Sequence, residues 1–419
     1  MRPALAVAAA AALAFLPSLG GVFHFDDYNV IVNYDTVHSW RALFERAGLG
    51  VRPLLKASYT FNWLFGGFAL LNIAFHAMNA ALLFLIGNEL FRDRRAAWIA
   101  ALLFALHPAA TEAVTYISGR SSSMMAVFYL GAMLAYLRGY RRTSVILFVM
   151  AVATRETAVT LPAALLLCEL CRPNFSFRTA FQRQWAHWAL LFAGAVFVLL
   201  NQRYFDLVAY GYGERSLGEN LITQVGGVSY LVLRLISLQG YNIDPALPTL
   251  IGWDPTAVFQ ALLLLALFMM GIANLRARPW IAFGILWFFL QLTPTNSIVP
   301  RLDVANDRQL YLASWGLFLA VSVELKSDLR VMVPILLAFA VASVIRQLDY
   351  RSEIALWESS VALAPWNARG HNNLGYAYQA AGRIEDARRE YRAALLFEPR
   401  HEKARFNLMF LPPENVKKP

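Results

Sequence analysis

Residues 70–91 read LLNIAFHAMNAALLFLIGNELF, and the basic group Arg92-Asp93-Arg94-Arg95 follows at once. An apolar run of this length is long enough for one helix to cross a hydrocarbon core of about 30 Å. A cluster of arginines directly after such a run is typical of the cytoplasmic end of a membrane helix. Similar runs recur along the chain, so this stretch predicts an all-α, multi-span membrane protein.

The bulk composition leads to the same fold class. Of the 419 residues, 58% are hydrophobic and 15% charged, and the mean hydropathy is +0.47, whereas about a quarter of the residues of a soluble domain are charged. The net charge of +10 does not indicate nucleic-acid binding, because the basic residues cluster in short connections between apolar runs. Cys168 and Cys171 form a lone C-x-x-C, which we interpret as two ordinary small apolar residues.

We predict about eleven membrane helices, the first at about residues 4–19 and the last at about 331–345. The first run also resembles a signal peptide, and we expect it to be retained as a span. With the N-terminus in the cytoplasm, every loop rich in arginine and lysine falls inside, and the C-terminal tail falls outside. The other nine spans are expected at about 70–91, 97–106, 124–137, 144–153, 158–170, 185–200, 257–273, 280–292 and 309–323.

Two long external loops interrupt this pattern within a membrane domain that we expect to cover residues 1–345. The loop at 20–68 is polar after its first residues and predicts interfacial helices. The loop at 201–255 contains an apolar helical stretch at about 221–238, which we interpret as an interfacial helix, with a further crossing as the alternative.

The tail, residues 346–419, predicts a short tetratricopeptide-repeat domain. Asn373-Leu374-Gly375, Ala387 and Ala394 fall at the spacings of such a repeat, as do Tyr378, Tyr391 and Pro399. Small residues at these positions let two antiparallel helices pack closely. Repeats of this kind need neighbours to bury their faces, so we expect a short stack with a binding or supporting role.

The outer ends of the predicted spans carry an unusual set of polar residues, at the depth where lipid headgroups meet water. An acid there can accept a proton from an attacking hydroxyl, and arginines can hold a phosphate. A polyprenyl phosphate that carries a sugar presents its phosphate at this depth. The set is His24, Asp26, Asp27, Arg52, His107, Glu112, Arg120, Arg155, Glu156, Asp307 and Arg308.

Structural explanations of the same residues stay open. Arg155-Glu156 could form an ion pair at a helix end, and His107-Pro108 could end a span. Arg52-Pro53 could anchor a helix start, and Asp307-Arg308 could cap a span. The Asp26-Asp27 pair could be solvated or could cap a helix. The convergence of all five groups on one side of the membrane favours the functional interpretation.

The same Asp26-Asp27 pair is a candidate site for Mg²⁺ or Mn²⁺, since these cations prefer carboxylate oxygens. The sequence has no histidine spacing typical of zinc sites. It also lacks a Walker motif and a G-x-S-x-G elbow, so nucleotide-driven transport and serine hydrolysis are unsupported.

Five groups of motifs follow one another along the chain. They are Phe25-Asp26-Asp27, Arg52-Pro53-Leu54 with Ser58, Ala105-Leu106-His107-Pro108 with Thr111-Glu112-Ala113-Val114 and Gly119-Arg120, Thr154-Arg155-Glu156-Thr157, and Asp307-Arg308-Gln309-Leu310-Tyr311-Leu312 with Ser314. In these motifs and their order, the chain resembles the GT-C glycosyltransferases of the TMTC type, which are membrane O-mannosyltransferases that carry tetratricopeptide repeats. The resemblance covers most of the membrane domain and the tail.

This resemblance implies a polyprenyl-phosphate sugar donor and an acidic catalytic residue in the first external loop. Asp27, or else Asp26, would be the base. Glu112, Arg155, Glu156 and Arg308 would line the donor headgroup or the acceptor site, and the repeats would lie on that side. Two features depart from the family: the repeat tail is short, and Asp307 stands where a glutamate is expected.

We therefore expect an inverting transfer of a sugar, such as mannose, to an acceptor hydroxyl on a protein or glycan. The Ala- and Arg-rich composition and compact tail favour a bacterial inner membrane, with the site facing the periplasm. Three alternatives stay open. They are a polymerase or ligase of lipid-linked glycans, a non-catalytic scaffold whose repeats recruit a partner, and a transporter of lipid-linked sugars.

Overall fold

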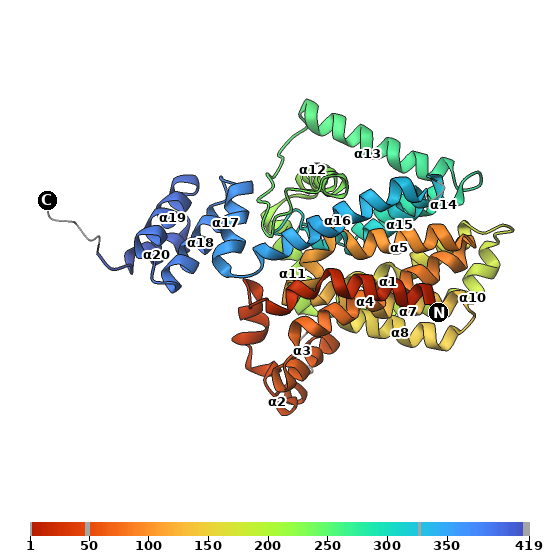
Figure 1. Cartoon of the computed structure of the whole chain (residues 1–419), viewed down its shortest axis with the longest axis horizontal. Coiled ribbons are helices and arrows are strands. Elements are labelled where there is room, and N and C mark those ends of the chain that lie inside the picture. Colours follow the sequence, from red (N-terminus) through yellow and green to blue (C-terminus); the bar gives the residue numbers. More distant parts are fainter. Residues whose placement is uncertain (1, 47–50, 326–327, 414–419) are drawn as a thin grey trace.

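The computed structural model describes residues 2–46, 51–325 and 328–413. All regular elements in these ranges are helices, and no strand occurs among them, which confirms the all-α expectation. A long helical bundle occupies one part of the molecule, and a smaller C-terminal unit projects from one end of it (Figure 1).

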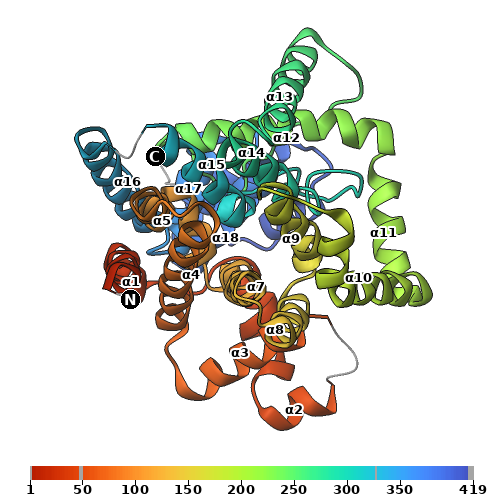
Figure 2. The same ribbon diagram turned by 90° about the vertical axis from the view of Figure 1, so that its right-hand side faces the viewer.

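Most of the bundle helices run roughly along the long axis of the molecule, and Figure 2 shows those helices nearly end-on. Each of the eleven apolar runs predicted above overlaps one α-helix, and the runs at 4–19 and 158–170 also include short 3₁₀ turns. The helices are α1 (Arg2–Ala14), α4 (Phe68–Phe91), α5 (Arg94–Leu106), α7 (Arg120–Leu137), α8 (Arg141–Thr154), α9 (Leu161–Leu170), α10 (Phe177–Leu200), α13 (Pro255–Ala273), α14 (Pro279–Leu292), α15 (Leu310–Glu324) and α16 (Leu329–Asp349).

Within the described residues, four helices are long and apolar enough to cross a membrane, namely α4, α10, α13 and α16. A fifth crossing is formed if α5 and the segment Pro108–Val114, bent by 57° relative to it, make one broken span. α1 and α14 are shorter apolar helices. Membrane crossing by about eleven helices therefore stays a prediction, although a helix is present at every expected position.

The first helix is packed into the bundle. Val7 and Ala11 of α1 and Phe15 just after it are fully buried, and α1 lies against α4 and α5. These contacts make α1 part of the bundle, and retention of the first run as a span stays a prediction.

Glycines allow α14 and α15 to approach closely. A Cβ atom on Gly284 would lie 2.4 Å from the carbonyl oxygen of Gly316, and one on Gly316 would lie 2.8 Å from that of Gly284. Trp287 and Trp315 are fully buried beside this contact, with ring centroids 5.4 Å apart. The contact fixes α15 against α14, and α15 directly follows the turn η8 (Asp307–Gln309).

Both expected external loops contain helices. The first has α2 (Trp40–Glu45) and α3 (Pro53–Phe65), and the second has α11 (Gln202–Glu214) and α12 (Leu217–Ile236). α12 begins earlier than expected because Ser216 and Glu219 form a capping box at its start. α12 is not among the described helices that are apolar enough to span a membrane.

The C-terminal unit consists of α17 (Glu353–Leu363), α18 (Ala368–Ala380), α19 (Ile384–Phe397) and α20 (Glu402–Met409). α18 and α19 pack closely at Gly375, where a Cβ atom would lie 2.7 Å from the ring of Tyr391. Helices therefore occupy the positions expected for a repeat, and the tetratricopeptide assignment itself stays a prediction. α16 continues to Asp349, past the boundary expected at residue 345.

Candidate active site

A cavity of about 570 Å³ lies at the end of the bundle that faces the C-terminal unit. Its wall is formed by the turn at Asp26, by α3, by the end of α11 and by the segment 300–308. Basic side chains outnumber acidic ones around it, which favours an anionic ligand. The basic residues are Arg52, Lys56, Arg155, Arg301 and Arg308, and the acidic residues are Asp26, Glu214 and Asp303.

The two neighbouring aspartates of the first loop have different surroundings. Asp27 is fully buried, and its carboxylate accepts hydrogen bonds from the backbone N–H groups of Ser118, at 2.7 Å, and His24, at 3.0 Å. Asp26 is partly exposed and lines the cavity, while its own N–H donates to the Tyr116 hydroxyl at 2.9 Å. Asp27 thus holds the turn, and Asp26 faces the open space.

The backbone just before this pair is unusual. Phe25 has a φ of 42°, a left-handed conformation that few non-glycine residues adopt. It persists because the bonds of Asp27 on one side and packing of the Phe25 ring on Trp357, with centroids 5.4 Å apart, hold it. This conformation separates the directions of the two carboxylates.

Burial raises the pKa of both carboxyl groups. For Asp26, burial is the largest cause, and the neighbouring Arg308 opposes it. For Asp27, burial raises the pKa to about 7 in spite of the two N–H donors. A carboxylate with a raised pKa is a better proton acceptor than an ordinary aspartate, and Asp26 is the one of the two that lines the cavity.

Glu112 positions Arg308. The backbone N–H of Arg308 donates to Glu112 Oε2 at 3.0 Å, and Arg308 Nε lies 3.5 Å from Glu112 Oε1. Glu112 is only 4% exposed and does not line the cavity, whereas Arg308 does. The buried Glu112 carboxylate, which lies outside the cavity lining, therefore helps to orient the Arg308 side chain toward the cavity.

Arg155 is a buried cation without an acidic partner. Its guanidinium donates to the hydroxyls of Ser121, at 3.1 Å, and Ser122. Its Nε has no hydrogen-bond partner, and no carboxylate lies within ion-pair distance among residues 2–46, 51–325 and 328–413. Burial, Arg308 and Arg52 lower its pKa to about 9. An anion in the cavity would supply the missing partner.

Glu156 pairs with Arg52 and not with its neighbour Arg155. Arg52 Nε donates to Glu156 Oε2 at 2.8 Å, and a second guanidinium nitrogen contacts Oε1. Burial alone would raise the pKa of Glu156, but Arg52 and Arg155 outweigh burial and lower it to about 2. Glu156 therefore stays ionised and neutralises the charge of Arg52, which lines the cavity.

Arg120 and His107 do not line the cavity. Arg120 is fully buried and donates to Asn72 Oδ1 at 2.7 Å and to the carbonyl oxygens of Ser58 and Phe68. His107 Nδ1 accepts the N–H of Ala109 at 3.2 Å, so its Nε2 donates to a carbonyl of α12 at 3.2 Å. In this arrangement both side chains join bundle segments together.

Asp307 and His24 also make inter-segment contacts. Asp307 accepts hydrogen bonds from the Tyr230 hydroxyl at 3.2 Å and from the N–H of Asn242 at 3.0 Å. His24 Nε2 lies 2.8 Å from the carbonyl oxygen of Tyr350. Of the expected set, the structure thus brings Asp26, Arg52, Arg155 and Arg308 to one cavity, with the Glu156 side chain paired to Arg52. His24, Asp27, His107, Glu112, Arg120 and Asp307 lie outside its lining.

Sequence reasoning missed Lys56, Arg301, Asp303 and Glu214, all of which line the cavity. Lys56 could have been found, because it stands one helical turn after Arg52 on the same face. Arg301 and Asp303 share an outer loop with Arg308, but their spacing follows no helical period. Glu214 ends α11, and no sequence pattern places that end beside α3.

The candidate divalent-cation site is less complete than the sequence suggests. Both oxygens of Asp27 accept backbone N–H groups, so Asp26 alone of the pair faces the cavity. No group of three or more His, Cys, Asp or Glu side chains able to hold a metal occurs in the described part of the chain. Binding of Mg²⁺ or Mn²⁺ by this pair stays a prediction.

Comparison with known proteins gives family-level similarity. Residues 49–220 match the family described as Mannosyltransferase (PIG-V). The chain is 24% identical over 438 residues to the protein O-mannosyl-transferase F38B6.6 of Caenorhabditis elegans, covering 93% of this chain and 61% of that one. It is 37% identical over 133 residues to mouse protein O-mannosyl-transferase TMTC3, covering 27% of this chain and 14% of that protein.

A third relative is mouse protein O-mannosyl-transferase TMTC4, which is 23% identical over 477 residues and covers 91% of this chain and 64% of that one. The chain thus spans less than two thirds of the length of these relatives. No solved structure matches it. Together the similarities support a membrane glycosyltransferase.

Proposed function

We propose that this protein is a membrane glycosyltransferase that moves a sugar, such as mannose, from a polyprenyl-phosphate donor to the hydroxyl of an acceptor. The observation that carries the proposal is the cavity in which Asp26 shares one lining with the unpaired Arg155 and with Arg308. A base and a phosphate site in one cavity are the two requirements of this transfer. The family similarities favour the same reaction class.

The phosphate of the donor fits the basic part of the cavity. Arg155 has no acidic partner among the described residues, and Arg301 has a pKa lowered by burial and then by the nearby Arg308. The donor phosphate is a diester with one negative charge, and the prenyl phosphate that leaves gains a second charge, so the repulsion among these arginines is offset more strongly as the bond breaks. Each charge-assisted hydrogen bond contributes about 1.5–3 kcal/mol. A volume of about 570 Å³ lies within the usual range for small-molecule sites, and the lipid tail would remain in the bilayer.

The chemistry is a single displacement. Asp26 accepts the proton of the acceptor hydroxyl, whose oxygen attacks the anomeric carbon. The bond from that carbon to the phosphate oxygen breaks, and the phosphate leaves with the electron pair, held by Arg155 and Arg308. One displacement at the anomeric carbon inverts its configuration. Because Asp26 and not Asp27 lines the cavity, we assign the base to Asp26 and a positioning role to Asp27.

The place in the cell belongs to the same proposal. The distribution of basic loops favours an orientation with the cavity and the C-terminal unit on the outer face of the membrane. With a bacterial origin, that face is the periplasmic side of the inner membrane. The acceptor would be a protein or a glycan that reaches the cavity from that side.

The test is transfer by the purified full-length protein in lipid nanodiscs. The probe is polyprenyl-phosphate mannose with a labelled sugar, offered with a peptide rich in serine and threonine, and parallel reactions contain EDTA or added Mg²⁺. The expected result is donor consumption with label on the peptide and an inverted anomeric configuration. Retained configuration would refute the single displacement. Absence of donor consumption with every lipid-linked sugar tried, while the protein stays folded, would refute the proposed function.

A further inference from the structure

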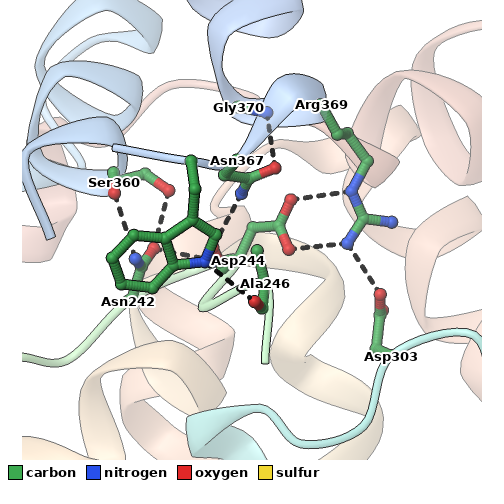
Figure 3. Close-up of polar contacts among 9 residues, drawn as sticks. Asn242, Asp244, Ala246, Asp303, Ser360, Asn367, Arg369 and Gly370 are labelled. Carbon is green, nitrogen blue, oxygen red and sulfur yellow. Dashed lines mark hydrogen bonds and ion pairs between the residues drawn. The ribbon is translucent and has the colours of Figure 1, made fainter. Parts of the chain in front are cut away.

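The C-terminal unit contacts one wall of the cavity through Arg369 of α18. Arg369 Nε donates to Asp244 Oδ2 at 2.7 Å, and Arg369 Nη2 donates to Asp244 Oδ1 at 2.6 Å and to Asp303 Oδ1 at 2.7 Å. Figure 3 shows the guanidinium between the two carboxylates. Asp303 belongs to the cavity lining, so one arginine ties the C-terminal unit to a residue of the site.

The contacts around Arg369 extend to the segment that supports Arg308. Asn242 Nδ2 donates to the carbonyl oxygen of Ser360 at 3.1 Å, and Ser360 Oγ donates to Asn242 Oδ1 at 2.6 Å (Figure 3). The backbone N–H of Asn242 donates in turn to Asp307, the neighbour of Arg308. The segment 242–244 is thus held between the C-terminal unit and the turn that carries Arg308.

The unit contacts a second part of the cavity wall, the turn before Asp26, through Glu353, the first residue of α17. Glu353 Oε1 accepts the backbone N–H of Phe25 at 3.0 Å and lies 3.2 Å from His24 Nδ1. Glu353 Oε2 accepts the indole N–H of Trp357 at 2.7 Å, and that indole packs on Phe25. Phe25 directly precedes Asp26, so this contact sets the turn that presents the assigned base.

We propose that the C-terminal unit is a positioning element of the active site, with Glu353 holding the Asp26 turn and Arg369 holding the Asp303 wall. The proposal rests on the proposed function, and it assigns the unit a role in the reaction itself. Neither residue touches substrate, because neither belongs to the cavity lining. Each acts through a residue that does.

Charge gives this coupling a measurable signature. Burial is the largest cause of the raised pKa of Asp26, and the charge of Arg308 opposes it. Of the two residues in the contact described above, Asp303 raises the pKa of Asp26 and Arg369 lowers that pKa. In a plot of kcat/KM against pH, Asp303→Asn should therefore move the acidic limb to lower pH, and Arg369→Gln should move this limb to higher pH. A purely structural contact would reduce activity without moving the limb in opposite directions.

The experiment compares these variants in nanodiscs with Arg389→Ala as a matched control. Arg389 is a 68% exposed arginine of the same unit, paired with Asp386 and far in sequence from the cavity-lining segments. We expect kcat/KM to fall about tenfold or more for Asp303→Asn, the loss of one charge-assisted hydrogen bond, and to stay unchanged for Arg389→Ala. Unshifted limbs in both variants would overturn the proposal.

Asp303→Asn is the decisive variant if Arg369→Gln fails to fold, because Asp244 is only 4% exposed and would lose its partner, whereas Asp303 is 39% exposed. A second readout needs no activity. In Glu353→Gln, hydrogen exchange of the amides at 25–27 should accelerate about tenfold, with α18 protected as in the wild type. Unchanged exchange there would overturn the positioning role of Glu353. This readout remains valid if the wild type transfers no sugar, so the two proposals can fail separately.

Discussion

Replacing Asp26 with asparagine separates the two aspartates of the first loop. The substitution removes one charge at nearly constant size. The backbone N–H of Asp26 would keep its bond to the Tyr116 hydroxyl, and its carboxylate has no hydrogen bond to any residue of the described ranges. We therefore expect a change in unfolding free energy of less than about 0.5 kcal/mol.

The cost to catalysis should be much larger. A positioned general base contributes about 10²- to 10⁴-fold, equivalent to about 3–5 kcal/mol of activation free energy. We expect kcat to fall by that factor. The KM for the donor should stay equal or decrease, because the substitution removes a negative charge close to Arg308. Loss of kcat without loss of donor binding is the pattern of a removed base.

The assay is initial-rate transfer from polyprenyl-phosphate mannose by the protein in nanodiscs, and Asp27→Asn is the matched control. That variant carries the same chemical change one residue along, but at a fully buried carboxylate that accepts two backbone N–H groups. It should lose about 1.5–3 kcal/mol of stability and retain most of its kcat per folded molecule. If Asp26→Asn keeps full kcat and folded Asp27→Asn loses a hundredfold, the base is Asp27 and our assignment is wrong.

Three further perturbations test the cavity. Arg155→Gln removes a buried charge without an acidic partner, so it should raise the melting temperature of the protein in the absence of donor. The same variant should bind a short-chain prenyl phosphate about tenfold or more weakly, as measured by thermal shift. If the variant binds this phosphate as the wild type does, Arg155 does not belong to the phosphate site. Glu112→Gln should lower kcat/KM about tenfold, because it loses the charge that orients Arg308, and steady-state kinetics would show no change if Glu112 only fills space. The pKa of Asp27, raised by burial to about 7 from about 4 in the unfolded chain, means that the folded state favours the protonated form. Stability should therefore fall as pH rises from about 4 to about 7, and a melting series should show a smaller fall in Asp27→Asn; equal slopes would contradict the assignment.

Helix positions could be predicted from the sequence because apolar length depends on local composition. The run at 70–91 corresponds to α4 (Phe68–Phe91), and the small residues Gly375 and Ala387 correctly indicated a close helix pair. α12 starts earlier than the predicted residue 221, because a capping box at Ser216 extends the helix into polar sequence. Such boundaries depend on single side chains and not on periodicity.

The site was only partly predictable, since the partners that decide each role are distant in sequence. Arg155 and Glu156 are neighbours, yet Glu156 pairs with Arg52, 104 residues away. In the sequence, Arg120 stands beside an apolar run just as Arg155 does. In the structure, however, its guanidinium donates to the side-chain amide oxygen of Asn72 and to the carbonyl oxygen of Ser58. No local pattern distinguishes an arginine bound by carbonyl groups from one that faces a cavity.

The contact between Glu353 and the turn at Phe25 also fixes the order in which the protein is completed. The two residues are separated by 328 positions, and chains fold from the N-terminus as they are made. The early membrane helices are in place while the residues that hold both walls of the cavity have still to emerge. A growing chain therefore holds its acids and arginines without their final spacing, and the site matures only when the last helices dock.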